Sequence, residues 1–274
     1  MAHSSAEPVM FCKDPAIAFL KDIGYSVIRL PRRDFTPLLM LAGENKALEA
    51  LGTLDGVLVG EKLAPAIVAD EPVADISGQR TSELSLGIGL NILGNIIGAM
   101  GGSKLALDAA YKSARSVSFE FVDVLRDSVR ISDLDKYLGA SDVDPGAKTI
   151  GQMLEASDVF VVTSILKSRR ISVAAKSDSN AELSLDVPTI QGIVGGKVKV
   201  SAAVSASHVL SYEGEVPLVF GFQAVRLFYD EGRYTAFEPA ADVAARAVRD
   251  LEKPSTLPEG VKAFVSNGAF ARLG

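Results

Sequence analysis

The side chains that most often catalyse reactions or hold metal ions are scarce in this sequence. It contains two histidines, His3 and His208, and one cysteine, Cys12. Metalloprotease motifs need two histidines at close spacing, and structural zinc sites draw on several cysteine or histidine ligands. His3 lies in a polar leader far from His208, and Cys12 has no second thiol for a disulfide. We therefore expect no metal site and no disulfide.

One glycine-rich segment invites comparison with a phosphate-binding loop. Residues 98–104 read GAMGGSK, but the motif requires glycine directly before its lysine, where this chain has Ser103. The sequence also lacks a Gly-x-Ser-x-Gly nucleophile turn, and no pair of carboxylates stands out from its 34 acidic residues. With no catalytic residues to name, we expect a protein that is not an enzyme and has no cofactor.

Composition limits the class of protein further. The chain has 274 residues, 48% hydrophobic and 23% charged, which is typical of a globular protein with a sizeable core. Its net charge is −6 and its pI is about 5.1. Nucleic-acid binding needs clustered excess lysine and arginine, so we expect no nucleic-acid partner. The N-terminus lacks a basic segment followed by a long apolar run, which favours a cytoplasmic location.

Two-residue alternation dominates the second half of the chain. Val117, Phe119 and Phe121 share one face of an expected strand, residues 159–176 contain no glycine or proline, and residues 183–187 and 197–205 alternate again. A half-buried sheet gives this pattern, and so do the lipid-facing strands of a membrane barrel. The pattern leaves both readings open, although the soluble antiparallel sheet is the commoner.

Three other segments have a less regular pattern. Residues 84–103 are free of charge and long enough to span a membrane, but six glycines and two asparagines weaken that reading. We expect a flexible apolar segment that is helical or extended, with a buried core helix as the alternative. Residues 127–154 are expected to be helical with a break at Pro145. After an expected helix over residues 240–251, an open linker leads to an apolar end that needs a docking surface, as a removable cover would.

Several segments of the chain resemble gasdermins, in particular the compact bacterial ones. The opening segment is CKDPAIAFLKDIGY over residues 12–25, followed by VIRLPR over 27–32. Two later segments, VFVVTSIL over 159–166 and VPLVFGFQAVRL over 216–227, are similar to animal members as well. The resemblance covers nearly the whole chain from Met10.

The resemblance implies a fold and a function. The expected fold is α+β, with a twisted, mainly antiparallel central sheet surrounded by helices. It implies an autoinhibited pore-forming protein: residues 1–9 a leader, residues 10–251 the pore-forming domain, and residues 252–274 a short inhibitory peptide. A partner caspase-like protease would remove the peptide, and the resting monomer in the cytoplasm would assemble with many copies in the lipids of the inner membrane. The resulting β-barrel would kill the cell in defence against phage.

The resemblance also assigns roles to individual residues. Residues 81–124 and 159–205 would refold into the two membrane-inserting hairpin regions. Their expected inserting side chains are Leu86, Ile88, Leu90, Phe119, Phe121, Val161, Ile171, Val173, Leu183, Leu185, Val198 and Val200.

Three further assignments concern the two ends of the chain. Cys12 stands third if Met10 is the start, the position at which bacterial gasdermins carry a palmitoylated cysteine. Candidate cleavage residues are Arg249, Leu251 and Asp250, and Phe264, Val265 and Phe270 are expected to hold the inhibitory peptide against the sheet. The alternative is a non-enzymatic binding module whose C-terminal peptide only stabilises the fold.

Overall fold

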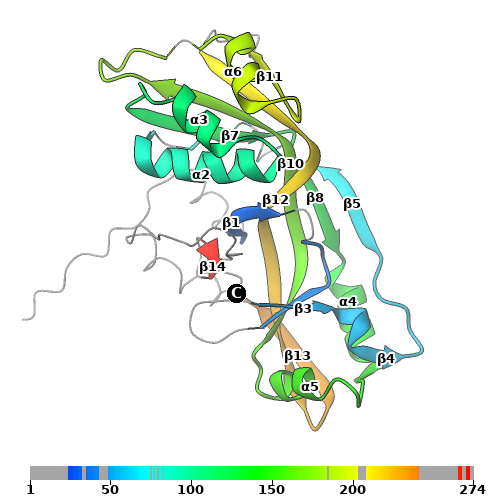
Figure 1. Ribbon diagram of the computed structural model, residues 1–274. Coiled ribbons are helices and arrows are strands. Elements are labelled where there is room, and N and C mark those ends of the chain that lie inside the picture. Colours follow the sequence, from blue (N-terminus) through cyan, green and yellow to red (C-terminus); the bar gives the residue numbers. More distant parts are fainter. Residues whose placement is uncertain are drawn as a thin grey trace, which may run out of the picture.

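The computed structural model describes residues 24–32, 35–42, 49–74, 76, 78, 80–81, 83–183, 185–202, 208–240, 265–266 and 270–271. Helices lie at both ends of a long bent sheet (Figure 1). The helices are η1 (Leu54–Gly56), α2 (Leu86–Ala99), α3 (Lys104–Ala110), α4 (Ile131–Leu138), α5 (Lys148–Glu155) and α6 (Val187–Val194). The strands are β1 (Ser26–Arg32), β2 (Leu39–Ala42), β3 (Glu49–Thr53), β4 (Leu58–Gly60), β5 (Ile67–Pro72), β6 (Leu84–Ser85), β7 (Ser116–Val122), β8 (Leu125–Val129), β9 (Ser141–Val143), β10 (Val159–Lys176), β11 (Val198–Ala202), β12 (Val209–Asp230), β13 (Arg233–Pro239), β14 (Val265–Ser266) and β15 (Phe270–Ala271).

Two long strands, β10 and β12, run the length of the molecule as an antiparallel pair. Along the free side of β10, strands β2, β8 and β7 pair one after another, and β3, β5 and β6 extend the sheet beyond them. Along the free side of β12 lie β13, β1 and β11. Within the described residues these elements make one antiparallel sheet of 11 strands. The expected α+β fold with a mainly antiparallel central sheet is confirmed.

The sheet bends at its middle, where the register of β10 on β12 shifts between Leu166 and Lys167 and again between Ser168 and Arg170. Opposite this point, Asp123 separates β7 from β8 and has a φ of 52°, a left-handed conformation that costs energy for a side chain other than glycine. An extra residue in a ladder bends a strand and increases its twist. The bulges therefore divide the sheet into two ends, each with its own core.

The end at the top of Figure 1 is covered by α2, α3 and α6, and we call it the helix-covered end. Its core buries side chains from these helices against β7, β10, β11 and β12. The opposite end has a second core, built from β2, α4, α5 and the far ends of β10 and β12. Burying each leucine or isoleucine side chain contributes roughly 1.5–3 kcal/mol, so both cores stabilise the bent sheet substantially.

Several expected elements differ from those observed. Strand β10 has the expected limits, Val159–Lys176. The expectation of a helix over 127–154 is wrong in part, because β8 and β9 interrupt it and only α4 and α5 are helical. The alternating segment 183–187 is not a strand. Its last residue begins α6, whose N-cap Asp186 accepts a hydrogen bond from the Thr189 N–H.

Residues 84–103 form β6, α2 and the turn that leads to α3, with Ser103 as the N-cap of α3. The segment thus contains the buried core helix that was the alternative expectation. No helix within the described part of the chain is long and apolar enough to cross a membrane.

Candidate functional site: the helix-covered end of the sheet

Helix α2 packs closely on β7 at Gly89 and on α3 at Gly94. A Cβ atom on Gly89 would lie 3.3 Å from the Val117 Cβ, and a Cβ on Gly94 would lie 2.8 Å from the Lys104 Cγ of α3. Larger residues at these positions would push α2 away from its neighbours. The two glycines thus allow α2 to pack directly on the sheet and on α3, which brings Leu93 and Ile97 into the core.

A buried pair of tyrosines joins α3 to the sheet. The hydroxyls of Tyr111, which follows α3, and Tyr212 on β12 lie 2.9 Å apart, and both side chains are almost fully buried. Burial raises the pKa of Tyr111 to about 12, with the hydrogen bond between the two hydroxyls partly offsetting the effect. Burial also raises the pKa of Tyr212. Both hydroxyls therefore stay protonated at neutral pH, and each satisfies the other in an apolar core.

This pairing leads to a stability prediction. Replacing one tyrosine with phenylalanine leaves the other hydroxyl buried without its partner, which costs about 1–3 kcal/mol, whereas removing both hydroxyls is nearly neutral. We expect Tyr111→Phe and Tyr212→Phe each to lower the free energy of unfolding, and the double variant to recover most of the loss. Urea denaturation of the unmodified protein, the two single variants and the double variant gives the four free energies of unfolding. If the loss in the double variant equals the sum of the two single losses, the hydroxyls do not act as a pair.

The structure brings most of the predicted inserting residues together in this one end. The helix-covered core contains, or has packed against it, Leu86, Leu90, Phe119, Phe121, Ile171, Val173, Leu183, Leu185, Val198 and Val200. Ile88 does not join them and is 59% exposed on α2. Val161 lies in the core of the opposite end, where β10 pairs with β2. Apart from Ile88 and Val161, the predicted inserting residues therefore share one core in this structure.

A charged cluster marks the bend between the two ends, and no sequence motif had indicated it. Lys167 Nζ lies 2.7 Å from Asp127 Oδ2 and 2.8 Å from Asp70 Oδ1, and the Asp70 N–H donates to Asp127 Oδ1. Burial alone would lower the pKa of Lys167, but its hydrogen bonds to Asp127 and Asp70 raise it. The side chains of Lys167 and Asp127 are only 13% and 12% exposed. The cluster ties β5, β8 and β10 together through nearly buried charges.

The C-terminal strands lie against the edge of the sheet. Strands β14 and β15 pair as a small hairpin, and both contact β1, the outermost strand beside β12. The same strand β1 also contacts α2. Val265 and Phe270 belong to this hairpin, so two of the three predicted inhibitory residues lie in the segment that contacts β1.

The remaining predicted positions at the two ends of the chain lie outside the described residues. These are Cys12, Arg249, Asp250, Leu251 and Phe264.

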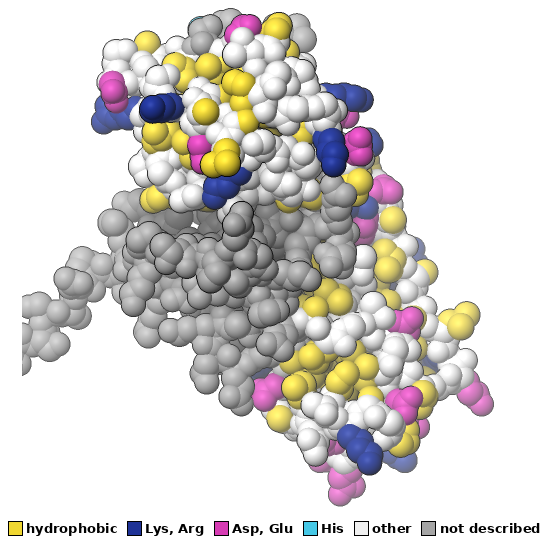
Figure 2. Space-filling model, viewed as in Figure 1, with side chains coloured by type: hydrophobic (Ala, Val, Ile, Leu, Met, Phe, Trp, Pro, Cys, Tyr) yellow, Lys and Arg dark blue, Asp and Glu magenta, His cyan; other side chains and the backbone are white. Residues whose placement is uncertain are grey.

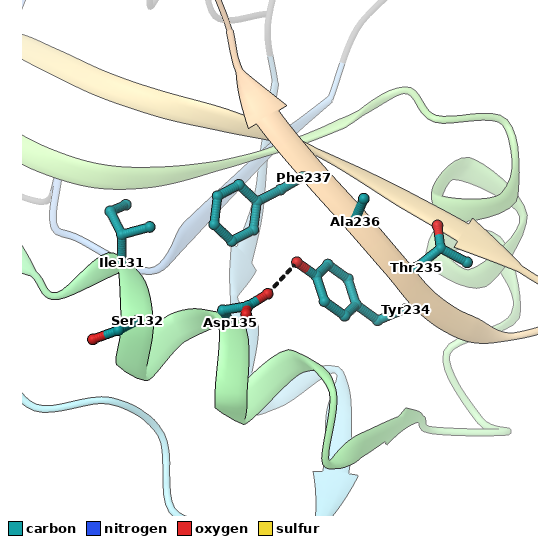
Figure 3. Close-up of a pocket in the computed structure, with 7 residues that line it drawn as sticks. All are labelled: Ile131, Ser132, Asp135, Tyr234, Thr235, Ala236 and Phe237. Atoms are coloured by element: carbon teal, nitrogen blue, oxygen red, sulfur yellow. Dashed lines mark hydrogen bonds between the residues drawn. The ribbon is translucent and has the colours of Figure 1, made fainter.

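A shallow hollow of about 420 Å³ lies at the opposite end, between α4 and β13 (Figure 3). The Tyr234 hydroxyl donates to Asp135 Oδ1 over 2.7 Å across it. The one carboxylate among the residues that line this hollow is thus already hydrogen-bonded, and the lining residues include Ser132 but no histidine that could act as its base. Within the described residues no three histidine, cysteine or acidic side chains gather as metal ligands would.

Comparison with known proteins agrees with this arrangement. The sequence matches the Bacterial Gasdermin Family over residues 28–233. The chain belongs to the bacterial gasdermin family. A gasdermin from a Desulfuromonadales bacterium is 47% identical over 266 residues, which cover 96% of this chain and 99% of the relative. A gasdermin from Lysobacter enzymogenes is 43% identical over 244 residues, 87% of this chain and 90% of the relative.

A solved structure supports the fold of this gasdermin. The bacterial gasdermin from Bradyrhizobium tropiciagri superimposes with a TM-score of 0.60 at 18% identity, covering 82% of this chain and 92% of that chain. Gasdermins are a pore-forming family without enzymatic activity, which confirms the expectation that the chain is not an enzyme. Membership of the family also implies membrane binding and an oligomeric pore.

Proposed function

We propose that this gasdermin is held inactive by its C-terminal segment and forms large β-barrel pores once a protease removes that segment. The observation that carries the proposal is the position of the β14–β15 hairpin on β1, the strand that also contacts α2. A segment in this place covers the edge of the sheet next to the helix that must move. Its removal would uncover β1 and weaken the support of α2.

The sequence of β6 and α2 supports insertion as a strand. Residues 84, 86, 88, 90 and 92 are leucine or isoleucine, and the residues between them are Ser85, Gly87, Gly89 and Asn91. This is the alternation of a lipid-facing strand, although residues 86–92 are helical at rest. Residues 81–124 and 159–205 supply the two inserting regions of the proposal.

Insertion must be coupled to assembly. An open strand edge in hydrocarbon leaves backbone N–H and C=O groups unsatisfied, at a cost of several kcal/mol for each. Only a closed barrel of many protomers avoids such edges. Before cleavage the protein would therefore be a monomer in the cytoplasm, and after cleavage many copies would form a ring in the inner membrane. The resulting pore would kill the cell, which would stop the spread of an infecting phage.

Two further elements of the proposal act at the ends of the chain. A palmitoyl chain on Cys12 would add about 0.8 kcal/mol of membrane affinity for each buried methylene. One chain alone anchors weakly, so it assists the barrel and does not replace it. A caspase-like protease would cut near Arg249, Asp250 or Leu251, between residues 10–251 and the inhibitory segment 252–274.

A direct test uses the full chain with the recognition sequence of a specific protease inserted between Leu251 and Val261. Added to dye-filled vesicles that contain anionic lipids, the uncut chain should be silent, and the dye should be released after cutting. An uncut chain with Phe264→Ala and Phe270→Ala should leak without protease, because burial of each phenylalanine against the sheet, as proposed, would contribute roughly 1.5–3 kcal/mol to docking of the peptide. A binding module would show neither effect, and sealed vesicles after complete cutting would overturn the proposal.

A further inference from the structure

The two halves of α2 carry different sequence patterns. In the second half the buried side chains are Leu93, Ile96, Ile97 and Met100, spaced as one face of a helix. In the first half the apolar side chains alternate as in a strand, which leaves Ile88 59% exposed. The first half of α2 is thus a helix although its apolar residues alternate as in a strand. It follows directly after β6, which pairs with β7.

The beginning of α2 has little local stabilisation, whereas its end is closed by Gly101, which has a φ of 98°, and by the bond from the Gly102 N–H to the Ile97 carbonyl. The N-cap residue Ser85 makes no side-chain capping bond, and α2 has no acidic residue in its first turn and no basic residue in its last turn. By contrast, Ser103 caps α3 and Asp186 caps α6. The first half of α2 is therefore held mainly by its packing on β7, α3 and the rest of the helix-covered core.

Two of the glycines in α2 have no role in that packing. A Cβ at Gly87 or Gly98 would meet nothing within 4 Å, and neither residue has the positive φ that favours glycine. This differs from Gly89 and Gly94, which contact β7 and α3 closely. Asn91 is exposed, and its side chain only accepts a 3.4 Å hydrogen bond from Lys104 Nζ. Glycine and asparagine are both weak helix formers, so these three positions lower the stability of the helix, and among them only Asn91 makes a side-chain contact, the long bond from Lys104.

We infer that residues of α2 keep the stability of this helix low, and that unfolding of α2 sets the rate at which the cut protein forms pores. Gly87, Asn91 and Gly98 are the residues that set this rate. The inference rests on the proposed function, because it takes α2 to unfold before its first half joins the inserting strand. Alanine at these positions strengthens the helix in the resting state and leaves the apolar alternation intact.

The test is the variant Gly87→Ala/Asn91→Ala/Gly98→Ala in the full chain with the inserted protease site. Each substitution slows opening by about two- to threefold, with Gly87 and Gly98 at the lower end because they lie in the terminal turns, so the triple variant should release dye about tenfold more slowly after cutting. The matched control is Thr149→Ala/Gly151→Ala in α5, outside both inserting regions. There a Cβ on Gly151 makes an ordinary 3.6 Å contact with Val143, and Thr149 is exposed.

Hydrogen exchange of the uncut proteins supplies an independent measurement. The triple variant should slow exchange of the α2 amides, and the control should slow exchange in α5 alone and release dye at the original rate. Slower α2 exchange with an unchanged release rate would overturn the inference and leave the proposed function standing. Equal slowing of release by both variants would also overturn it, since general stability would then set the rate. Absence of release from the unmodified cut chain would instead overturn the proposed function, and the inference with it.

Discussion

A disulfide between α2 and β7 is expected to abolish dye release by the cut protein, and a reducing agent is expected to restore it. The pair is Gly89→Cys with Val117→Cys, in a chain whose native thiol is removed by Cys12→Ser. A Cβ on Gly89 lies 3.3 Å from the Val117 Cβ, within a few tenths of an ångström of the separation of about 3.5–4.5 Å that disulfides require. The bond would fix α2 in its resting place.

The observed register explains why this bond blocks the proposed refolding. Leu84 of β6 pairs with Val117, and Ser85 pairs with Ser116. If β6 lengthened in the same register, residue 89 would lie opposite residue 112, five residues away from Val117. A covalent link between residues 89 and 117 is therefore incompatible with the lengthened strand.

The controls for this experiment are the two single-cysteine variants, which should release dye with or without the reducing agent. They separate the effect of the cross-link from that of a side chain at Gly89, where the fit is tight. Full release by the oxidised double variant would mean that α2 stays on β7 during insertion. Residues 81–124 would then not form an inserting hairpin in the proposed way.

The sequence predicted those parts of the fold whose local pattern agrees with their final environment. Strand β10 has no glycine or proline and is rich in valine, isoleucine and threonine, so its limits could be read directly. The predicted inserting residues on β7, β10 and β11 likewise meet in one core, because alternating apolar faces pack on the same side of a sheet. Figure 2 shows the outer surface of this end, where small groups of hydrophobic side chains lie on a mainly uncharged surface with charged side chains around them.

Other parts could not be predicted because local and tertiary preferences disagree. The first half of α2 has the pattern of a strand, and only packing on β7 and α3 keeps it helical. The segment 183–187 alternates too, yet Asp186 followed by Val187 and Pro188 is a helix start, a signal that outweighs the short alternation.

Contacts between distant segments leave no trace in a single sequence. Tyr111 and Tyr212 are 101 positions apart, and the sequence gives no reason to join them. In the sequence Lys167 is one of many charged residues and follows an apolar segment, and its partner Asp127 lies 40 positions away. Only the fold shows that these polar groups meet where they are largely buried from solvent.

A large loss of stability is also expected when Lys167, at the bend of the sheet, loses its charge. Lys167→Met removes the only positive charge that contacts Asp127 among the described residues, and Asp127 is 12% exposed. Removing one partner of a buried ion pair costs about 3–5 kcal/mol because the remaining charge is uncompensated. We expect a loss of about 3 kcal/mol in the free energy of unfolding, at the lower end of that range because Asp70 is 66% exposed and water reaches the cluster.

A second substitution tests the cause of this loss. Asp127→Asn keeps an oxygen to accept the Asp70 N–H bond and removes the charge. In the double variant Lys167→Met/Asp127→Asn, the buried charge is gone, so stability should recover by at least about 1 kcal/mol relative to Lys167→Met alone. Urea denaturation of the four proteins gives the coupling energy. If the two losses simply add, the cost of Lys167→Met comes from altered packing at the bulge, and the charged cluster does not hold the bend.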